Sequence, residues 1–294
     1  MKQMNRSQIE GTLYLVTATM LYGLVGVFLK FIGYQLPLFY QNWTRYIVAA
    51  LLILVTIRRW ETIKKRDYLW IGLRTLAGIS AFVLFTVSVN VMQIGMTYFI
   101  FYGGSTIGGY ILGWFLFHER PTTLRIACLG LAIIGLSLVY GVGAQAHGPL
   151  YMMLAFLSGI CTSFWNTASK KITEYPATQL AFVDVALAVP VYFILSAITR
   201  EAWPITDMST VQGASLLLGV IIAATGILMV HGFRKLDAQI GSLIMLTEIV
   251  FVIIYGYIFY HEVPTMLTTI GGLLIVIAMI LPEITWRQSK KARI

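Results

Sequence analysis

The sequence predicts an all-α integral membrane protein whose ten transmembrane helices form two inverted five-helix repeats. Three observations support this fold class: a very apolar composition, apolar runs of spanning length along the whole chain, and a motif that recurs at a fixed offset. Of the 294 residues, 58% are hydrophobic and only 11% are charged, whereas soluble domains carry roughly 25% charged residues. One soluble core of this size could not bury so much apolar surface.

Apolar runs of 18 or more residues recur from one end of the chain to the other, and each is about long enough to cross ~30 Å of hydrocarbon. Only helices and closed barrels satisfy their backbone polar groups in lipid, and these runs lack the strict alternation of barrel strands. The expected spans are 11–31, 36–57, 68–90, 95–117, 122–141, 149–168, 178–199, 211–232, 238–260 and 265–283. No connection between them is long enough to form a soluble domain.

The basic residues give the orientation. Seventeen of the 21 lysines and arginines lie before the first span, in or beside the even-numbered connections, or in the tail. The odd-numbered connections hold only Arg200, with Lys30 close to one of them. Lysine and arginine mark the cytoplasmic side, so both termini are expected in the cytoplasm, in a multi-pass protein of the cell membrane. An odd number of spans would break this alternation.

A repeated turn divides the chain into two halves. Residues 117–122 read FHERPT and residues 260–265 read YHEVPT, an offset of 143 residues, and at the same offset Tyr22 corresponds to Trp165. We therefore expect one five-helix repeat in residues 1–143 and a second in residues 144–294. Because five is an odd number, the second copy enters the membrane inverted, which is how many secondary transporters build two access states around one central site.

These stretches resemble the drug/metabolite transporter superfamily, in particular its ten-helix EamA-type members. The similarity rests on residues 20–30 (MLYGLVGVFLK), residues 43–50 (WTRYIVAA), and the two His-Glu turns with the apolar helices that follow them. It implies export or exchange of small organic solutes, such as amino acids and other metabolites, through a cavity between the repeats. Smaller multidrug-exporting relatives carry a proton-coupling carboxylate eight residues before the helix-one lysine. Tyr22 occupies that place here, so any proton coupling needs another group.

Ionisable groups inside a span are costly and are therefore functional candidates. Glu248, near the middle of the ninth span, either relays protons, binds a substrate ammonium group, or is a neutral acid hydrogen-bonded inside the bundle. Arg45, near the middle of the second span, either fixes helix packing or contacts an anionic substrate. Lys30 is close enough to the interface to extend its amine to water, or it binds an anion at the mouth of the cavity.

Asp184 and Arg74 enter the membrane from the same predicted side, each roughly 9 Å deep at 1.5 Å per residue. We expect them to form a structural ion pair, with catalysis or substrate contact as the alternatives.

Tyr22, Tyr98, Tyr102, Trp165 and Asn166 lie within spans and combine apolar area with hydrogen-bonding groups. Such side chains suit the lining of a site for a partly apolar solute. The alternative for each is ordinary packing. The correspondence of Tyr22 with Trp165 across the repeat strengthens the lining interpretation for these two.

Glycines in the fourth span predict close helix packing on two sides. Gly104 and Gly108 share one face, and Gly109 and Gly113 share another face rotated well away from it. Small residues at this spacing let neighbouring backbones approach closely. We expect two neighbouring helices to pack tightly here, and the alternative is that the adjacent glycines loosen this helix for a rocking motion.

A secondary transporter, either an exporter or an exchanger, is the function these features favour. The alternatives are an intramembrane enzyme and a channel-like facilitator, but no G-x-S-x-G, HExxH or P-loop pattern occurs in the sequence. We expect no cofactor, no metal site and no catalytic residues, because these signatures are missing. The net charge of +9 follows membrane topology and does not indicate a nucleic-acid partner. The expected partners are the lipid bilayer and a small-molecule substrate, with the chain acting as a monomer or a homodimer.

The predicted orientation can be tested by cysteine labelling in a background that lacks Cys128 and Cys161. Ala146→Cys and Thr206→Cys should react with an impermeant thiol reagent added to intact cells. Thr62→Cys should react only after the cells are permeabilised, because it lies in the strongly basic second connection. Labelling of position 62 from outside would reverse the orientation.

Overall fold

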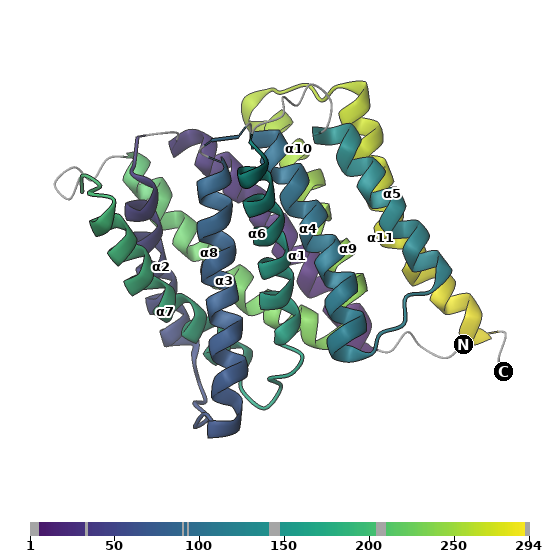
Figure 1. Ribbon diagram of the computed structural model, residues 1–294, viewed down its shortest axis with the longest axis horizontal. Coiled ribbons are helices and arrows are strands. Elements are labelled where there is room, and N and C mark those ends of the chain that lie inside the picture. The colour runs from purple at the N-terminus through teal and green to yellow at the C-terminus, as the bar shows by residue number, and fades with distance from the viewer. Residues whose placement is uncertain are drawn as a thin grey trace.

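The computed structural model describes residues 6–32, 35–89, 91–92, 94–140, 148–203 and 210–291, which form a bundle of helices (Figure 1). Its helices are α1 (Arg6–Ile32), α2 (Leu38–Thr56), α3 (Tyr68–Val89), α4 (Ile94–Phe117), α5 (Thr123–Tyr140), α6 (Pro149–Ala168), α7 (Ala177–Ile198), α8 (Thr210–Lys235), α9 (Ala238–Met245), α10 (Thr247–Tyr260) and α11 (Met266–Lys291), with one 3₁₀ turn, η1 (Lys65–Asp67). The predicted all-helical fold class is confirmed.

Eight segments of the described chain are long and apolar enough to cross a membrane. Seven are single helices, namely α1, α2, α3, α4, α5, α7 and α8, and the eighth is α9 and α10 taken together. The two remaining predicted spans correspond to α6 and to the apolar part of α11, Met266–Pro282. α6 ends in Trp165, Asn166 and Thr167, whose polar groups lower its hydropathy. The chain is a multi-pass membrane protein.

α1 begins and α11 ends at the same end of the bundle (Figure 1). We call this the terminal end and the other the distal end. Lys235, the last residue of α8, pairs with Glu10 near the start of α1, so α8 also ends at the terminal end. The positions used for the labelling test, Ala146 and Thr206, lie outside the described residues, and so does the predicted boundary between residues 143 and 144.

The two halves repeat the same helices at the offset of 143 residues found in the motif. Added to the first residue of α1, this offset gives Pro149, where α6 begins, and added to the first residue of α5 it gives Met266, where α11 begins. Helix contacts repeat as well, because α1 packs on α8 as its counterpart α6 packs on α3. In the same way α4 packs on α6, and α10 packs on α1. The halves are therefore interlocked, with most of the large helix contacts running between them.

Close approach of α4 and α6 depends on glycine. A Cβ atom on Gly159 would lie 2.1 Å from the Phe101 carbonyl oxygen, and one on Gly104 would lie 2.4 Å from the Phe156 carbonyl oxygen. On the other face of α4, a Cβ on Gly109 would lie 2.5 Å from the Cβ of Ser242 in α9. Two neighbours thus pack on two faces of α4, which confirms the prediction from its glycine spacing.

The ninth predicted span, 238–260, is confirmed as one segment long and apolar enough to cross the membrane, but it is interrupted at Leu246 and is not one continuous helix. The Leu246 N–H donates to the Leu243 carbonyl oxygen at 3.2 Å, and the Ile249 N–H donates to the Leu246 carbonyl oxygen at 3.1 Å. These three-residue steps separate α9 from α10 by a 3₁₀-like turn. The Thr247 hydroxyl donates to the Ile244 carbonyl oxygen at 2.7 Å and meets the Thr19 hydroxyl at 2.9 Å. Neither glycine nor proline marks the break, so the sequence pattern did not reveal it.

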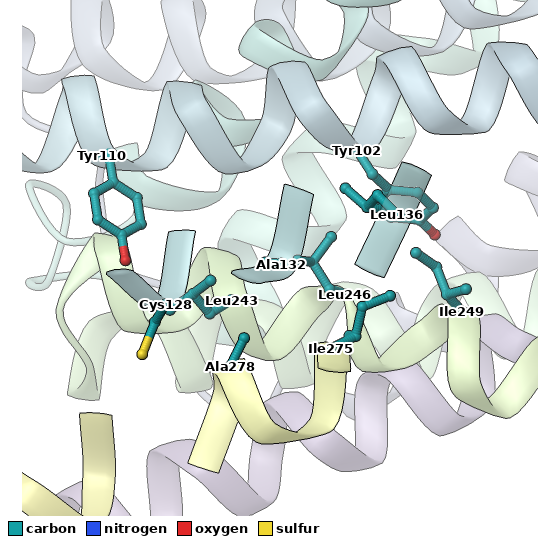
Figure 2. Packing of buried hydrophobic residues seen from close by; sticks show 10 residues of the cluster. All are labelled: Tyr102, Tyr110, Cys128, Ala132, Leu136, Leu243, Leu246, Ile249, Ile275 and Ala278. Atoms are coloured by element: carbon teal, nitrogen blue, oxygen red, sulfur yellow. The ribbon is translucent and has the colours of Figure 1, made fainter. Parts of the chain in front are cut away.

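A buried apolar cluster fills the space where α4, α5 and α11 meet the break between α9 and α10 (Figure 2). Leu136 from α5 and Ile275 from α11 are fully buried, and Leu246 is inserted from the break itself. The free thiol of Cys128 packs into the same cluster. α5 and α11 therefore support the broken helix from outside.

Candidate functional site

A cavity of about 260 Å³ lies between the two halves of the chain. Every helix except α5 and α11 contributes to its wall. The lining reaches Leu38, the first residue of α2, and Val89, the last residue of α3, so the cavity extends toward the distal end. Its walls are mostly apolar with a few polar groups, as is usual for a small-molecule site.

Most of the side chains selected from the sequence meet at this cavity. The residues that line it are Tyr22, Arg45, Tyr98, Tyr102, Trp165, Asn166, Asp184 and Glu248. Arg74 stands behind the wall, bound to Asp184, and Lys30 lies near the distal end of α1. Asn166 is buried, and its Oδ1 atom has no hydrogen-bond partner.

Asp184 joins three helices on one wall of the cavity. Its carboxylate forms a buried ion pair with Arg74, accepts from the Thr75 hydroxyl at 2.8 Å, and accepts from the Trp165 indole N–H at 2.9 Å. The Arg74 guanidinium also lies 5.7 Å from the centre of the Trp165 ring. Because Asp184 already accepts from the Trp165 indole N–H, the part of Trp165 left to line the cavity is its ring. Asp184, fully engaged by α3 and α6, serves as a structural centre.

Glu248 lies in the first turn of α10, immediately after the helix break. A negative charge at a helix N-terminus is stabilised by the free N–H groups and the dipole of that helix. The Tyr102 hydroxyl hydrogen-bonds this carboxyl group, and the hydroxyls of Tyr22, Tyr98 and Tyr140 are close enough to interact with it electrostatically. Among the described residues, no ion pair includes Glu248.

Arg45 is 3% exposed, although its side chain lines the cavity. One of its terminal nitrogens donates to the Asn42 side-chain oxygen, and its Nε has no hydrogen-bond partner among the residues that the structure describes. The guanidinium carbon lies 5.8 Å from the centre of the Phe82 ring. The hydroxyls of Tyr46 and Tyr192 are close enough to interact with its charge.

Further aromatic rings line the cavity, and the sequence interpretation missed several of them. The rings of Tyr46 and Tyr192 pack edge to face with their centres 5.2 Å apart, and the centre of the Phe82 ring lies 5.7 Å from that of Tyr192. The centre of the Tyr98 ring lies 5.0 Å from that of Phe85, and Tyr98 stacks on the predicted Tyr102 with the ring centres 5.9 Å apart. The spacing of Phe82 and Phe85, three residues apart on one helix face, is the signal that could have found them.

The two His-Glu turns form matching ion pairs at opposite ends of the bundle. At the terminal end Lys170 donates to Glu119 at 2.5 Å, and we call this pair the terminal latch. At the distal end Lys30 pairs with Glu262 and lies 4.3 Å from the centre of the Tyr260 ring. We call this pair the distal latch. Lys30 thus has a protein partner, where the sequence suggested free extension to water or an anion site.

The backbone of the two turns is repeated as closely as the charges. His118 and His261 both adopt the left-handed conformation, with φ of 54° and 53°. The N–H of the following glutamate then donates to a glycine carbonyl six residues back, at 3.0 Å for Glu119 and 3.2 Å for Glu262. This is a common way to end a helix. Each turn therefore fixes its glutamate where α4 or α10 ends.

The latches differ in their surroundings. Glu119 also accepts from the N–H groups of Ala238 at 2.9 Å and Gln239 at 3.3 Å, so it caps the start of α9. Its side chain is 8% exposed and that of Lys170 is 17% exposed. In the distal latch the exposed fractions are 49% for Lys30 and 57% for Glu262.

The connection between α6 and α7 covers the terminal end beside the buried latch. Arg234 donates to the Ser169 carbonyl oxygen at 3.3 Å and to that of Ile172. The Tyr175 hydroxyl donates to Asp67 at 2.7 Å, which ties this connection to the one between α2 and α3. Nearby, the hydrogen bond from Lys64 holds the pKa of Glu174 below its usual value. These contacts join the connections at the terminal end to one another and to α8.

Inverted repeats around a central cavity are the architecture of secondary transporters. The sequence matches the model of the EamA-like transporter family twice, over residues 9–141 and 149–282. The chain therefore belongs to the EamA-like transporter family, whose members are membrane transporters of small molecules and not enzymes.

Twenty-nine chains of solved structures match this one. Among them, a crystal structure of a protein has a TM-score of 0.80 at 15% sequence identity, covering 96% of this chain and 99% of that one. At this identity the likeness shows the fold alone. A search of curated proteins finds no match.

The buried ion pair of Arg74 and Asp184 gives a stability test. Asp184→Leu should lower the free energy of unfolding by about 3–5 kcal/mol, because it leaves the Arg74 charge buried without its partner. Arg74→Met combined with Asp184→Leu should recover most of that loss. Thermal melting in detergent micelles measures both changes.

The exposed pair of Arg66 with Glu174 is the control, and Arg66→Gln should hardly move the melting temperature, since solvent screens this pair. If the single Asp184 variant melts like the unaltered protein, the structural role of the pair is wrong.

Proposed function

We propose that this protein is a secondary transporter that moves small organic solutes, such as amino acids or related metabolites, by alternating access to the central cavity. Net movement would be export or exchange across the cell membrane, with both termini in the cytoplasm. The cavity supports this proposal because it lies between the two inverted halves and is lined by both of them.

The two latches are the observation that carries the proposal. Each joins the turn that follows one helix to the other half of the chain, and they lie at opposite ends of the bundle that surrounds the cavity. In this structure the terminal latch is buried and caps α9, whereas the distal latch is half exposed at the end of the bundle toward which the cavity extends. Such a difference is expected of a state that is closed at the terminal end.

Exchanging the conformations of the two repeats would bury the distal latch and expose the terminal one. Inverted repeats make this exchange inexpensive, because each half can adopt the arrangement that the other half already shows. With the predicted topology, the terminal latch faces the cytoplasm and the state described here opens outward.

Glu248 is the group we assign to coupling or to a substrate ammonium group. A carboxyl group surrounded by hydrocarbon must be neutral or have a cation nearby, and no described residue provides that cation. Protons or a cationic group of the solute would then be its partner during the cycle. Glu248 lies in the first turn after the helix break, so a change in its charge or partner acts directly on the backbone at that break.

Cross-linking the latches should stop transport. Cysteine pairs replace Glu119 with Lys170 in one protein and Lys30 with Glu262 in another, both lacking Cys128 and Cys161. Each pair is closed by a bis-methanethiosulfonate reagent and reopened by dithiothreitol. We expect either closed cross-link to reduce counterflow of a panel of labelled amino acids in proteoliposomes to the protein-free background, reversibly.

Alternating access requires both ends of the protein to open in turn, so a cross-link that keeps one end closed is sufficient to stop transport. The same proteins treated with a monofunctional reagent are the control for the loss of charge. Counterflow that continues through a protein with either latch cross-linked would contradict the mechanism.

Glu248→Gln separates coupling from packing, because the amide keeps the shape but does not titrate. We expect this variant to fold and to lose most of the stimulation that a pH gradient gives the unaltered protein. If the carboxylate binds an ammonium group, counterflow is lost as well. Glu61→Gln, at an exposed site outside the cavity, is the matched control. Unchanged pH-gradient stimulation in Glu248→Gln would remove this residue from the mechanism.

A further inference from the structure

We propose that Arg45 is the carboxylate-binding residue of the cavity, so that the solutes it accepts carry one carboxylate on a mainly apolar body. This inference rests on the proposed transport function and specifies its substrate. It concerns a residue for which the sequence left helix packing and substrate contact open.

The first support is the lack of a protein anion for this charge. Arg45 is buried, yet in the part of the chain that the structure describes it forms no ion pair. Asp184, the carboxylate on the adjacent helix α7, is already engaged by Arg74, Thr75 and Trp165. A buried guanidinium without a counter-ion is costly. A solute anion would remove this cost each time it binds.

The second support is the hydrogen-bonding pattern. An unpaired buried donor is destabilising, so a solute group that accepts from Arg45 would stabilise it. Arg45 binds Asn42 through one terminal nitrogen and leaves its Nε–H without a partner. Nε–H and one terminal N–H form an edge of the guanidinium with two roughly parallel donors, and such an edge matches the two oxygens of a carboxylate. The Nε of Arg74 is also unpaired, but that guanidinium already has the Asp184 carboxylate as its anion.

The surroundings define the rest of the ligand. The hydroxyls of Tyr46 and Tyr192 share a hydrogen bond and lie close to the Arg45 charge, so one of the two has its proton free to donate to an anion. The ring of Phe82 covers the guanidinium, and further aromatic rings extend along the wall. One positive charge among apolar groups balances one negative charge, which favours a carboxylate over a phosphate dianion. Glu248, on α10, lines the same cavity, and its carboxyl group can pair with an ammonium group if the solute also carries one.

The test begins with the unaltered protein in lipid nanodiscs. The probes are 4-methylpentanoate and 4-methylpentanamide, which have the same shape and differ in charge. Binding is followed by the fluorescence of Trp165, against a Trp165→Phe background signal, and by the melting temperature. We expect the carboxylate to bind at least about tenfold more tightly than the amide, as a charge-assisted hydrogen bond implies. Equal binding of the two probes, or no binding of the carboxylate, would overturn the proposal without any variant at Arg45.

Variants then assign the effect to Arg45. Arg45→Gln should remove the preference for the carboxylate, and Arg45→Lys, which keeps the charge but not the planar pair of donors, should retain part of it. Arg66→Gln, an arginine outside the cavity, should behave like the unaltered protein. A carboxylate preference that persists in a folded Arg45→Gln protein would refute the assignment.

Counterflow of the same labelled carboxylate distinguishes this inference from the proposed function. If the carboxylate binds through Arg45 but no labelled solute crosses the membrane, the transport function fails and the binding site stands. If solutes cross, and Arg45→Gln carries the carboxylate as well as the unaltered protein does, the binding site fails and the transport function stands.

Discussion

Every charge inside this bundle requires a partner, because hydrocarbon offers no water to replace one. This constraint explains much of the polar architecture. Arg74 and Asp184 satisfy each other within the wall, and the lysines at the two ends are paired with the glutamates of the His-Glu turns. Once these pairs are formed, the charged side chains that remain without an ion-pair partner deep in the described bundle are Arg45 and Glu248, and both face the cavity.

Because of the duplication, a paired glutamate occurs in a His-Glu turn at each end of the bundle. A glutamate at each helix end would be unremarkable alone, since an acidic group near a helix start is favourable in any protein. Here Glu119 caps α9, which belongs to the other half, and not the α5 helix that follows it in the sequence. An ion pair that also holds the start of a neighbouring helix couples the closing of one end of the cavity to the position of that helix.

The class of fold was predicted well because apolar composition determines which segments enter the membrane and basic residues determine their orientation. The repeat offset is visible in the sequence itself. The sequence also placed Arg74 and Asp184 at the same depth, which is sufficient to suggest that they meet. It could not predict contacts that depend on rotation about helix axes, such as the Trp165 hydrogen bond to Asp184 or the position of Tyr192 beside Arg45. The break at Leu246 could not be predicted for another reason. Side-chain hydrogen bonds of Thr247 stabilise it, and the sequence has no helix-breaking residue at this position.

The repeat copies the frame of the molecule but not the chemistry of its cavity. At the offset of 143 residues, Arg45 corresponds to Ala188 and Glu248 corresponds to Ser105, and both of these neutral counterparts also line the cavity. Leu246, at the break, corresponds to Gly103, within the continuous helix α4. A cavity built from two identical halves would present each charge twice and would have to separate like charges in hydrocarbon. With one cation on α2 and one carboxyl group on α10, the site has a defined polarity, so a solute with unlike ends can bind in one orientation while the frame around it exchanges between its two related states.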